Sequence, residues 1–298
     1  MQKPLIPLLL ALLSTPALAD KLPVLASFSI MADLVQEVGG ERVTVSSLVG
    51  PDQDAHVFQP APQDVKKLAA AKVFVVNGLG FEGWLNRLSK SSGFKGQTVV
   101  ASQGVKPLTL AEDDHDHGHD HGHASQDPHA WHNPQNVKLY VRNISAALSQ
   151  ADPAGKDYYS QRAQAYSQQL EQLDNDARQR FAAIPASQRK VLTSHDAFAY
   201  LAQRYQIRFL SPQGVSTEAE ASAKGVAKLV RQVKSEKIRA VFMENMSDKR
   251  LLEQLSREAG VQIGGKLYAD ALSPANGPAA SYVQLFKHNV DGLWTAMK

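Results

Sequence analysis

The chain has 298 residues, of which 43% are hydrophobic, and it carries a formal net charge of +3 and no cysteine. This length suggests two domains, and the apolar content suffices for substantial cores. The lack of cysteine excludes both a disulfide framework and a lipid-anchored cysteine. The small net charge gives no reason to expect a nucleic-acid partner.

Residues 1–19 have the pattern of a secretory signal peptide. Lys3 gives a positive start, residues 8–13 form an apolar stretch, and Ala17 and Ala19 provide a small-residue cleavage site. The apolar stretch is too short for a membrane span, and no later segment reaches the roughly 18 apolar residues that a span needs. We therefore expect a soluble mature protein that starts near Asp20 and resides in a bacterial periplasm.

Residues 20–151 alternate short β-branched runs with helical patterns, which predicts an α/β lobe with mostly parallel strands. The expected strands are residues 24–27, 43–48, 73–77 and 98–101, and the expected helices are residues 31–38, 61–71 and 84–91. His56 follows the second strand in a turn-rich segment, residues 51–60, where prolines restrict the backbone. Such rigidity suits a metal ligand, although a plain turn residue explains His56 equally well.

A His-rich loop at residues 112–124 interrupts this lobe. It holds half of the ten histidines of the chain, among carboxylates and glycines. Short His-rich tracts of this kind are typical of metal binding. Because glycine and alternating charge leave the loop no surface to pack, we expect only weak, exchangeable binding there. The histidines of this auxiliary site are His115, His117, His119, His121 and His123.

His129 lies directly after the loop, just before Asn133 and Pro134, which have the pattern of a helix start. Asp127 or a backbone carbonyl is suitably placed to accept a hydrogen bond from the other ring nitrogen of His129, as is usual for metal-bound histidine. The neighbouring His132 is the less favoured ligand of the two.

Residues 152–185 predict one long helix that connects two lobes. Apolar residues recur at steps of three and four from Tyr159 to Ile184, which indicates a single buried face. Asp152 is placed to cap the helix with Pro153 at its first position, and Pro185 ends it. A helix of this length would be a rigid backbone that limits hinge motion.

Residues 186–298 repeat the α/β alternation and predict a second lobe. The expected strands are residues 190–193, 207–210, 240–243 and 261–263, and the expected helices are residues 198–205, 221–236, 249–258 and 280–297. His195 follows the first of these strands, and Asp270 follows the last. Open α/β sheets bind ligands beyond the carboxyl ends of their strands. Glu244, at the end of another strand, is a candidate support for a ligand, whereas His288 fits a surface or core position.

Each of the four candidates, His56, His129, His195 and Asp270, can also be read alone as a capping or turn residue. Together they are more informative, because two come from each lobe. A site formed by all four would lie in the cleft between the lobes, where small ligands commonly bind.

The order and surroundings of these residues resemble the metal-specific solute-binding proteins of bacterial ABC importers. The resemblance covers nearly all of the mature chain. Its most specific segments are Asp127-Pro128-His129-Ala130-Trp131, Ser194-His195-Asp196-Ala197-Phe198, Gly214-Val215-Ser216-Thr217-Glu218-Ala219-Glu220 and Leu267-Tyr268-Ala269-Asp270-Ala271-Leu272. It implies two α/β lobes joined by a backbone helix, with one ion held between them by His56, His129, His195 and Asp270.

The resemblance also points to zinc as the cargo. Manganese- and iron-type members of that family tend to place a glutamate where this chain has His195. The His-rich insert of this chain is similar to the inserts of the zinc branch. Three imidazoles and one carboxylate suit Zn²⁺, whereas Mn²⁺ favours more oxygen ligands. Some zinc-binding relatives carry a disulfide in the second lobe, which this chain lacks. A manganese- or iron-binding member of the same family is the alternative.

A zinc enzyme and a metal-buffering adhesin are the alternatives from other classes. An enzyme needs an open coordination position, and a closed set of four ligands leaves none. The sequence also lacks H-E-x-x-H. We therefore expect a monomeric carrier that is no enzyme and that delivers zinc to an ABC permease with a cytoplasmic ATPase. A periplasmic zinc donor protein is a possible further partner of the His-rich loop.

Overall fold

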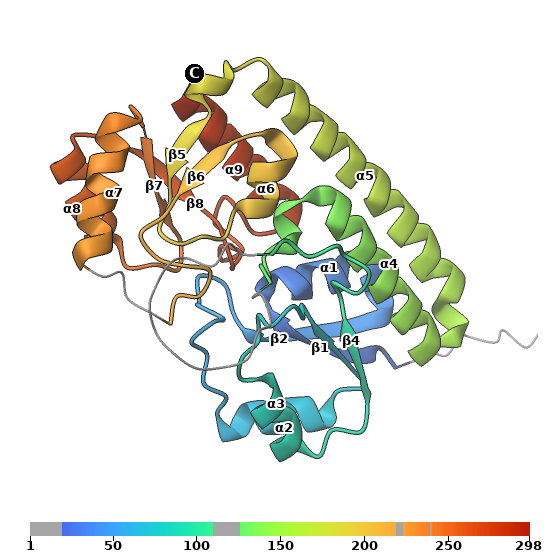
Figure 1. Ribbon diagram of the computed structural model, residues 1–298. Coiled ribbons are helices and arrows are strands. Elements are labelled where there is room, and N and C mark those ends of the chain that lie inside the picture. Colours follow the sequence, from blue (N-terminus) through green and yellow to red (C-terminus); the bar gives the residue numbers. More distant parts are fainter. Residues whose placement is uncertain (1–19, 110–125, 219–222, 239) are drawn as a thin grey trace, which may run out of the picture.

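The computed structural model describes residues 20–109, 126–218, 223–238 and 240–298. The predicted signal peptide, residues 1–19, and the His-rich loop, residues 112–124, lie outside these residues. The described chain forms two α/β lobes that share one long helix along their side (Figure 1). The predicted fold class is therefore confirmed.

The first lobe is built on a parallel sheet with the strand order β2-β1-β3-β4. Its strands are β1 (Leu22–Phe28), β2 (Val43–Val49), β3 (Val73–Val76) and β4 (Gln97–Val100). Its helices are α1 (Ser29–Gly39), α2 (Pro62–Ala70), α3 (Leu85–Ser92) and α4 (Pro134–Ala151). Helices α1 and α4 pack between the sheet and the long helix, and α2 and α3 lie together on the far side (Figure 1). The strand β3 is buried along its whole length, as expected of an apolar run inside a parallel sheet.

The second lobe repeats this plan with the strand order β6-β5-β7-β8, also parallel. Its strands are β5 (Lys190–Leu192), β6 (Arg208–Leu210), β7 (Ala240–Glu244) and β8 (Gln262–Leu267). Its helices are α6 (Ala199–Tyr205), α7 (Ala223–Ser235), α8 (Lys249–Ala259) and α9 (Tyr282–Met297). In each sheet the chain order reverses beside the first strand of the lobe, so both lobes have a switch point of the kind that binds ligands.

The connecting helix α5 (Lys156–Ala182) has 27 residues, which corresponds to a length of about 40 Å. It begins three residues later than predicted, because Pro153 opens a separate 3-10 turn, Pro153–Gly155. The predicted cap by Asp152 is wrong. Its carboxylate accepts hydrogen bonds from Arg42 at 2.8 Å and from the hydroxyl of Tyr159 at 2.6 Å, and it makes no capping bond.

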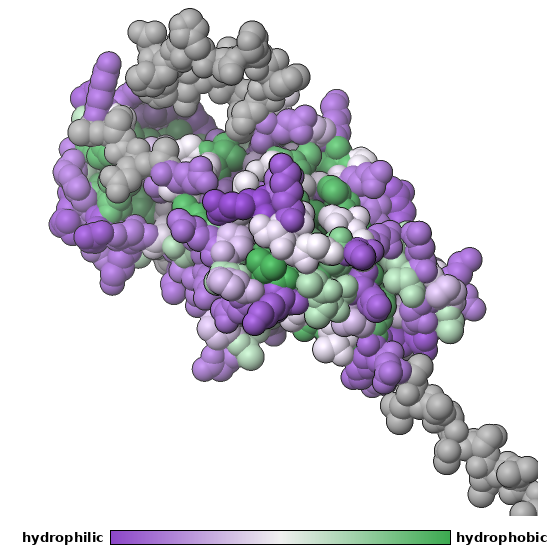
Figure 2. Space-filling view, turned by 90° about the horizontal axis from the view of Figure 1, so that it is seen from below, coloured by the Kyte–Doolittle hydropathy of each residue, from purple (hydrophilic) through white to green (hydrophobic). Residues whose placement is uncertain are grey.

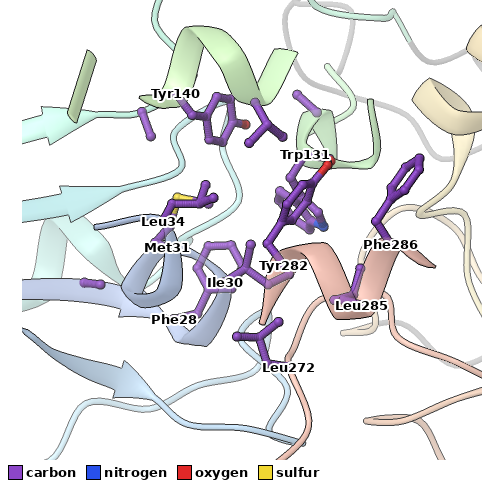
Figure 3. Close-up of a cluster of buried hydrophobic side chains, with 14 of the residues drawn as sticks. Phe28, Ile30, Met31, Leu34, Trp131, Tyr140, Leu272, Tyr282, Leu285 and Phe286 are labelled. Atoms are coloured by element: carbon purple, nitrogen blue, oxygen red, sulfur yellow. The ribbon is translucent and has the colours of Figure 1, made fainter. Parts of the chain in front are cut away.

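The two lobes pack directly on each other around a shared apolar core. Phe28 and Met31 of the first lobe and Leu272, Tyr282 and Phe286 of the second belong to one continuous cluster of buried side chains (Figure 3). A smaller second cluster lies beneath α7 and α8. Because the shared core spans the boundary, the approach of the lobes is fixed by packing as well as by α5.

Hydrophilic residues cover most of the face shown in Figure 2, with smaller apolar areas between them. None of the helices in the described part of the chain is long and apolar enough to cross a membrane.

Candidate metal centre

Four segments that follow strands or precede helices meet at the boundary of the lobes. His56 lies in the segment after β2, and His129 lies just before the 3-10 turn Ala130–His132 that leads into α4. His195 follows β5, and Asp270 follows β8. Two residues come from each lobe, and all four side chains are buried. The structure thus brings together the four residues that the sequence indicated.

The ligand atoms of these residues face one another at short distances. Nε2 of His56 lies 3.3 Å from Nε2 of His129 and 3.3 Å from Oδ2 of Asp270. The Asp270 carboxylate lies 3.5 Å from Nε2 of His129 and 3.1 Å from Nε2 of His195. Ligand atoms roughly 2.0–2.1 Å from a tetrahedral Zn²⁺ are roughly 3.3 Å apart. The four atoms all lie within 4.8 Å of one another, so one ion can contact the whole set.

The hydrogen-bond inventory of the centre is incomplete without a cation. Among the described residues, neither oxygen of Asp270 nor Nε2 of His195 has a hydrogen-bond partner of normal geometry, although all three atoms are buried. Buried polar atoms in native proteins are almost always satisfied. A cation between these atoms would satisfy all three at once.

Two carboxylates hold the histidine rings from behind. Nδ1 of His129 donates to Oδ1 of Asp127 at 2.8 Å, which confirms the expected role of Asp127. Nδ1 of His195 makes a short hydrogen bond with Glu244, and the backbone amide of His195 donates to the same carboxylate at 3.0 Å. With Nδ1 bonded in this way, Nε2 of each ring points to the centre.

The electrostatics of the centre favour a bound cation. Burial alone favours a neutral imidazole, but the Glu244 and Asp270 carboxylates outweigh it and hold the pKa of His195 well above its ordinary value. Burial likewise opposes the charge of Asp270, but His195 and His129 keep the pKa of this carboxyl well below its usual range. Without metal, a proton on His195 therefore neutralises part of the negative charge that a metal ion would otherwise balance.

The centre is closest to solvent at His56, whose side chain lies beside a cavity of about 420 Å³ lined also by Trp84, Arg87 and Glu218. The ring of His56 packs edge-on against Phe81, and its backbone amide donates to Asp54 at 2.9 Å. His129, His195 and Asp270 are fully buried, whereas 6% of His56 is exposed. Of the four candidate residues, His56 is thus the one nearest to solvent.

The remaining candidates lie outside the group of four. His132 is buried against Phe198, and burial lowers its pKa to about 3. Nε2 of His288 is hydrogen-bonded to the backbone carbonyl of Lys266 at 2.9 Å, and His288 does not belong to the group of four. The hydroxyls of Tyr200 and Tyr282, which no sequence pattern indicated, donate to backbone carbonyls on either side of His129. No sequence motif marks them, because tyrosines on the buried face of a helix usually serve packing.

Comparisons with known proteins agree with this architecture. The family model described as ZnuA, zinc-uptake complex component A, periplasmic, matches residues 24–296. The iron-binding protein YfeA of Yersinia pestis is 33% identical over 95% of this chain and 91% of its own length. The manganese ABC transporter substrate-binding lipoprotein PsaA of Streptococcus pneumoniae is 30% identical over 94% and 90%. The solved structure of the periplasmic zinc-binding protein TroA of Treponema pallidum superimposes with a TM-score of 0.86 at 29% identity, covering 93% of this chain and 99% of that one.

Proposed function

Since the chain belongs to the ZnuA family of periplasmic metal-binding components of ABC importers, we propose that its cargo is Zn²⁺, held by His56, His129, His195 and Asp270. Members of this family bind a substrate for transport and are not enzymes. In this proposal the protein captures one zinc ion between its lobes and releases it to a membrane permease.

The composition of the centre is the observation that carries this proposal. Three neutral imidazoles and one carboxylate form a nitrogen-rich set that suits tetrahedral Zn²⁺. His195 decides the balance, because a carboxylate in its place would give the oxygen-rich set that Mn²⁺ prefers. The names of the iron- and manganese-binding relatives support the alternative that this chain carries one of those ions.

Delivery requires partners that supply the energy. The sequence has no phosphate-binding loop of the form G-x-x-x-x-G-K-S/T, so ATP hydrolysis belongs to the ATPase of the importer. We propose that the exported, monomeric protein docks on the permease from the periplasmic side after the signal peptide at residues 1–19 has been removed.

We further propose that the His-rich loop is an auxiliary, weak zinc-binding segment that raises the local zinc concentration or receives zinc from a periplasmic donor protein. Its five histidines and adjacent carboxylates support this role by composition. Deleting residues 112–124 should reduce zinc uptake only under zinc starvation. Unchanged growth at every zinc concentration would contradict this role.

Metal selectivity tests the proposed cargo. The mature protein lacking residues 112–124 is stripped with a chelator, offered equal zinc and manganese, desalted and analysed for metal. The Asp270→Ala variant of the same shortened protein is the control for binding outside the centre. We expect one zinc per chain, and none in the control. One manganese per chain would overturn the cargo, and no retained metal would overturn the four-residue site.

A further inference from the structure

The backbone that carries His129 is held from both sides by the other lobe. The hydroxyl of Tyr200 on α6 donates to the carbonyl of Asp127 at 2.8 Å, and the hydroxyl of Tyr282 on α9 donates to the carbonyl of Trp131 at 2.8 Å. These carbonyls lie two residues before and two residues after His129. Both tyrosines belong to the second lobe, whereas residues 127–131 belong to the first.

A third hydrogen bond ties the same segment to the second lobe. Nε1 of Trp131 donates to the carbonyl of Ala269 at 3.0 Å, and Ala269 directly precedes the proposed ligand Asp270. Figure 3 shows the location of Trp131 and Tyr282, which come from opposite lobes and meet through the hydrogen bond from the Tyr282 hydroxyl. All three bonds are buried, so water cannot readily replace them.

Tyr200 is also connected to the ring of His129 through Asp127. Tyr200 holds the carbonyl of Asp127, and the carboxylate of Asp127 accepts hydrogen bonds from both Nδ1 and the backbone amide of His129. A shift of the Asp127 backbone therefore moves the ring and its acceptor together. The Tyr200 hydroxyl also accepts a hydrogen bond from the backbone amide of Leu108 at 3.1 Å, so it holds a second chain segment beside Asp127.

We propose that Tyr200 and Tyr282 are positioning residues that hold His129 in register with His195 and Asp270 across the lobe boundary. This inference rests on the proposed metal site. Tyr200 lies on the helix that begins shortly after His195, so its hydroxyl links two ligands of opposite lobes by a short path. Metal sites tolerate ligand displacements of only about 0.5 Å, and a fixed His129 avoids reorganisation when the ion arrives.

Three single substitutions separate this role from simple packing. Tyr200→Phe and Tyr282→Phe each remove one hydroxyl that holds the His129 segment. Tyr205→Phe is the matched control, because Tyr205 is also buried on α6 but its hydroxyl donates to Asp174 of α5, at 2.8 Å. For each variant we would measure the zinc dissociation rate by chelator competition and the melting temperature of the metal-free protein.

Zinc should leave the Tyr200→Phe and Tyr282→Phe variants roughly tenfold faster than the wild type, at the lower end of the effects known for groups behind metal ligands. The dissociation rate of Tyr205→Phe should stay at the wild-type value, even though its melting temperature falls as well. Equal dissociation rates in all three variants would overturn the inference. If Tyr282→Phe does not fold, the dissociation rates of Tyr200→Phe and Tyr205→Phe still test the inference, because only the first should exceed the wild-type rate.

A double-mutant cycle identifies the ligand through which the tyrosines act. In a His129→Ala background, Tyr200→Phe should change the dissociation rate no further, because the ring that it positions is gone. A full additional effect in that background would overturn the assignment to His129. If His129→Ala alone leaves zinc binding unchanged, the proposed site itself fails, and this outcome is distinct from a failure of the tyrosines.

Discussion

The two proposed ligands of the first lobe, His56 and His129, differ in how their segments meet the second lobe. Residues 127–131 are tied to it by three buried hydrogen bonds around His129. The segment of His56 is tied by one backbone bond, from the amide of Asp52 to the carbonyl of Leu272 at 2.9 Å. Its side-chain ties are more solvated, from Asn245 to Asp52 at 2.8 Å and from Thr217 to Asp54 at 2.7 Å. The His129 side of the centre is thus part of the packed core, whereas the His56 side lies at its edge.

This difference suggests how one site can both hold and release an ion. Breaking a buried hydrogen bond leaves unsatisfied groups, whereas water takes the place of an exposed one at little cost. The shared core and α5 oppose a wide separation of the lobes. We therefore expect His129, His195 and Asp270 to keep their arrangement while the His56 segment moves away.

The largest expected effect is the loss of Asp270. Its carboxylate lies within 3.5 Å of a ring nitrogen of all three histidines and is the only anionic group of the proposed set. Asp270→Ala should weaken zinc binding by more than the roughly 10- to 100-fold known for supporting groups, and more than His56→Ala does. Isothermal titration calorimetry of both variants, with the exposed Asp248→Ala as control, measures the difference. Equal losses for Asp270→Ala and His56→Ala would contradict the distinction between the two sides.

The carboxylate behind His195 should have the next largest effect. Glu244→Gln can keep acceptor bonds to the amides of Ser194 and His195 but removes the charge that faces Nδ1. Zinc affinity should fall roughly 10- to 100-fold. The control is Glu253→Gln, at a partly exposed glutamate on α8 that pairs with Lys249. An unchanged zinc affinity in Glu244→Gln would show that zinc binding by His195 does not need a negative charge at Nδ1.

Acid should weaken binding because the metal-free centre holds a proton that zinc must displace. The carboxylates of Glu244 and Asp270 overcome the effect of burial and raise the pKa of His195 well above its ordinary value, so the metal-free ring holds its proton more tightly than an ordinary imidazole. The metal-free state then binds more protons than the loaded state, and the affinity falls by up to about tenfold per pH unit for each proton displaced. Calorimetry at pH 7 in buffers of different ionisation enthalpy should detect proton release. Identical heats in all buffers would argue against it.

The sequence sufficed for the parts of this molecule that depend on local pattern. The alternation of apolar runs and helical stripes located the strands of both sheets, most clearly β3, whose continuous apolar run is buried along its whole length. The four residues of the candidate centre could be brought out because each follows a strand or precedes a helix, as His195 follows β5. The resemblance to a known family then joined four separate segments into one site.

The contacts that hold the ligands depend on tertiary structure and could not be predicted in the same way. Nothing near Tyr200 in the sequence indicates that its hydroxyl meets Asp127, which lies 73 residues away. The predicted cap by Asp152 was wrong for a similar reason, because Arg42, 110 residues away, competes for the same carboxylate. Local propensity cannot include a partner that only the fold brings near.

The smallest expected effect is on the solvated side of the centre. Thr217→Val removes the hydroxyl that donates to Asp54 with little change in shape, and Asp54 in turn accepts from the backbone amide of His56. A hydrogen bond of this kind contributes about 0.5–1.5 kcal/mol, so zinc should dissociate roughly 2- to 10-fold faster.

Ser216→Ala is the control. Within the described residues, the hydroxyl of Ser216 accepts only a local hydrogen bond, from the amide of Glu218. Stopped-flow chelation would measure both rates. A faster rate in Thr217→Val with an unchanged melting temperature places the release step at the His56 segment, because loosening the packed core would also lower the melting temperature. Equal rates for the two variants would mean that the ion leaves by another route.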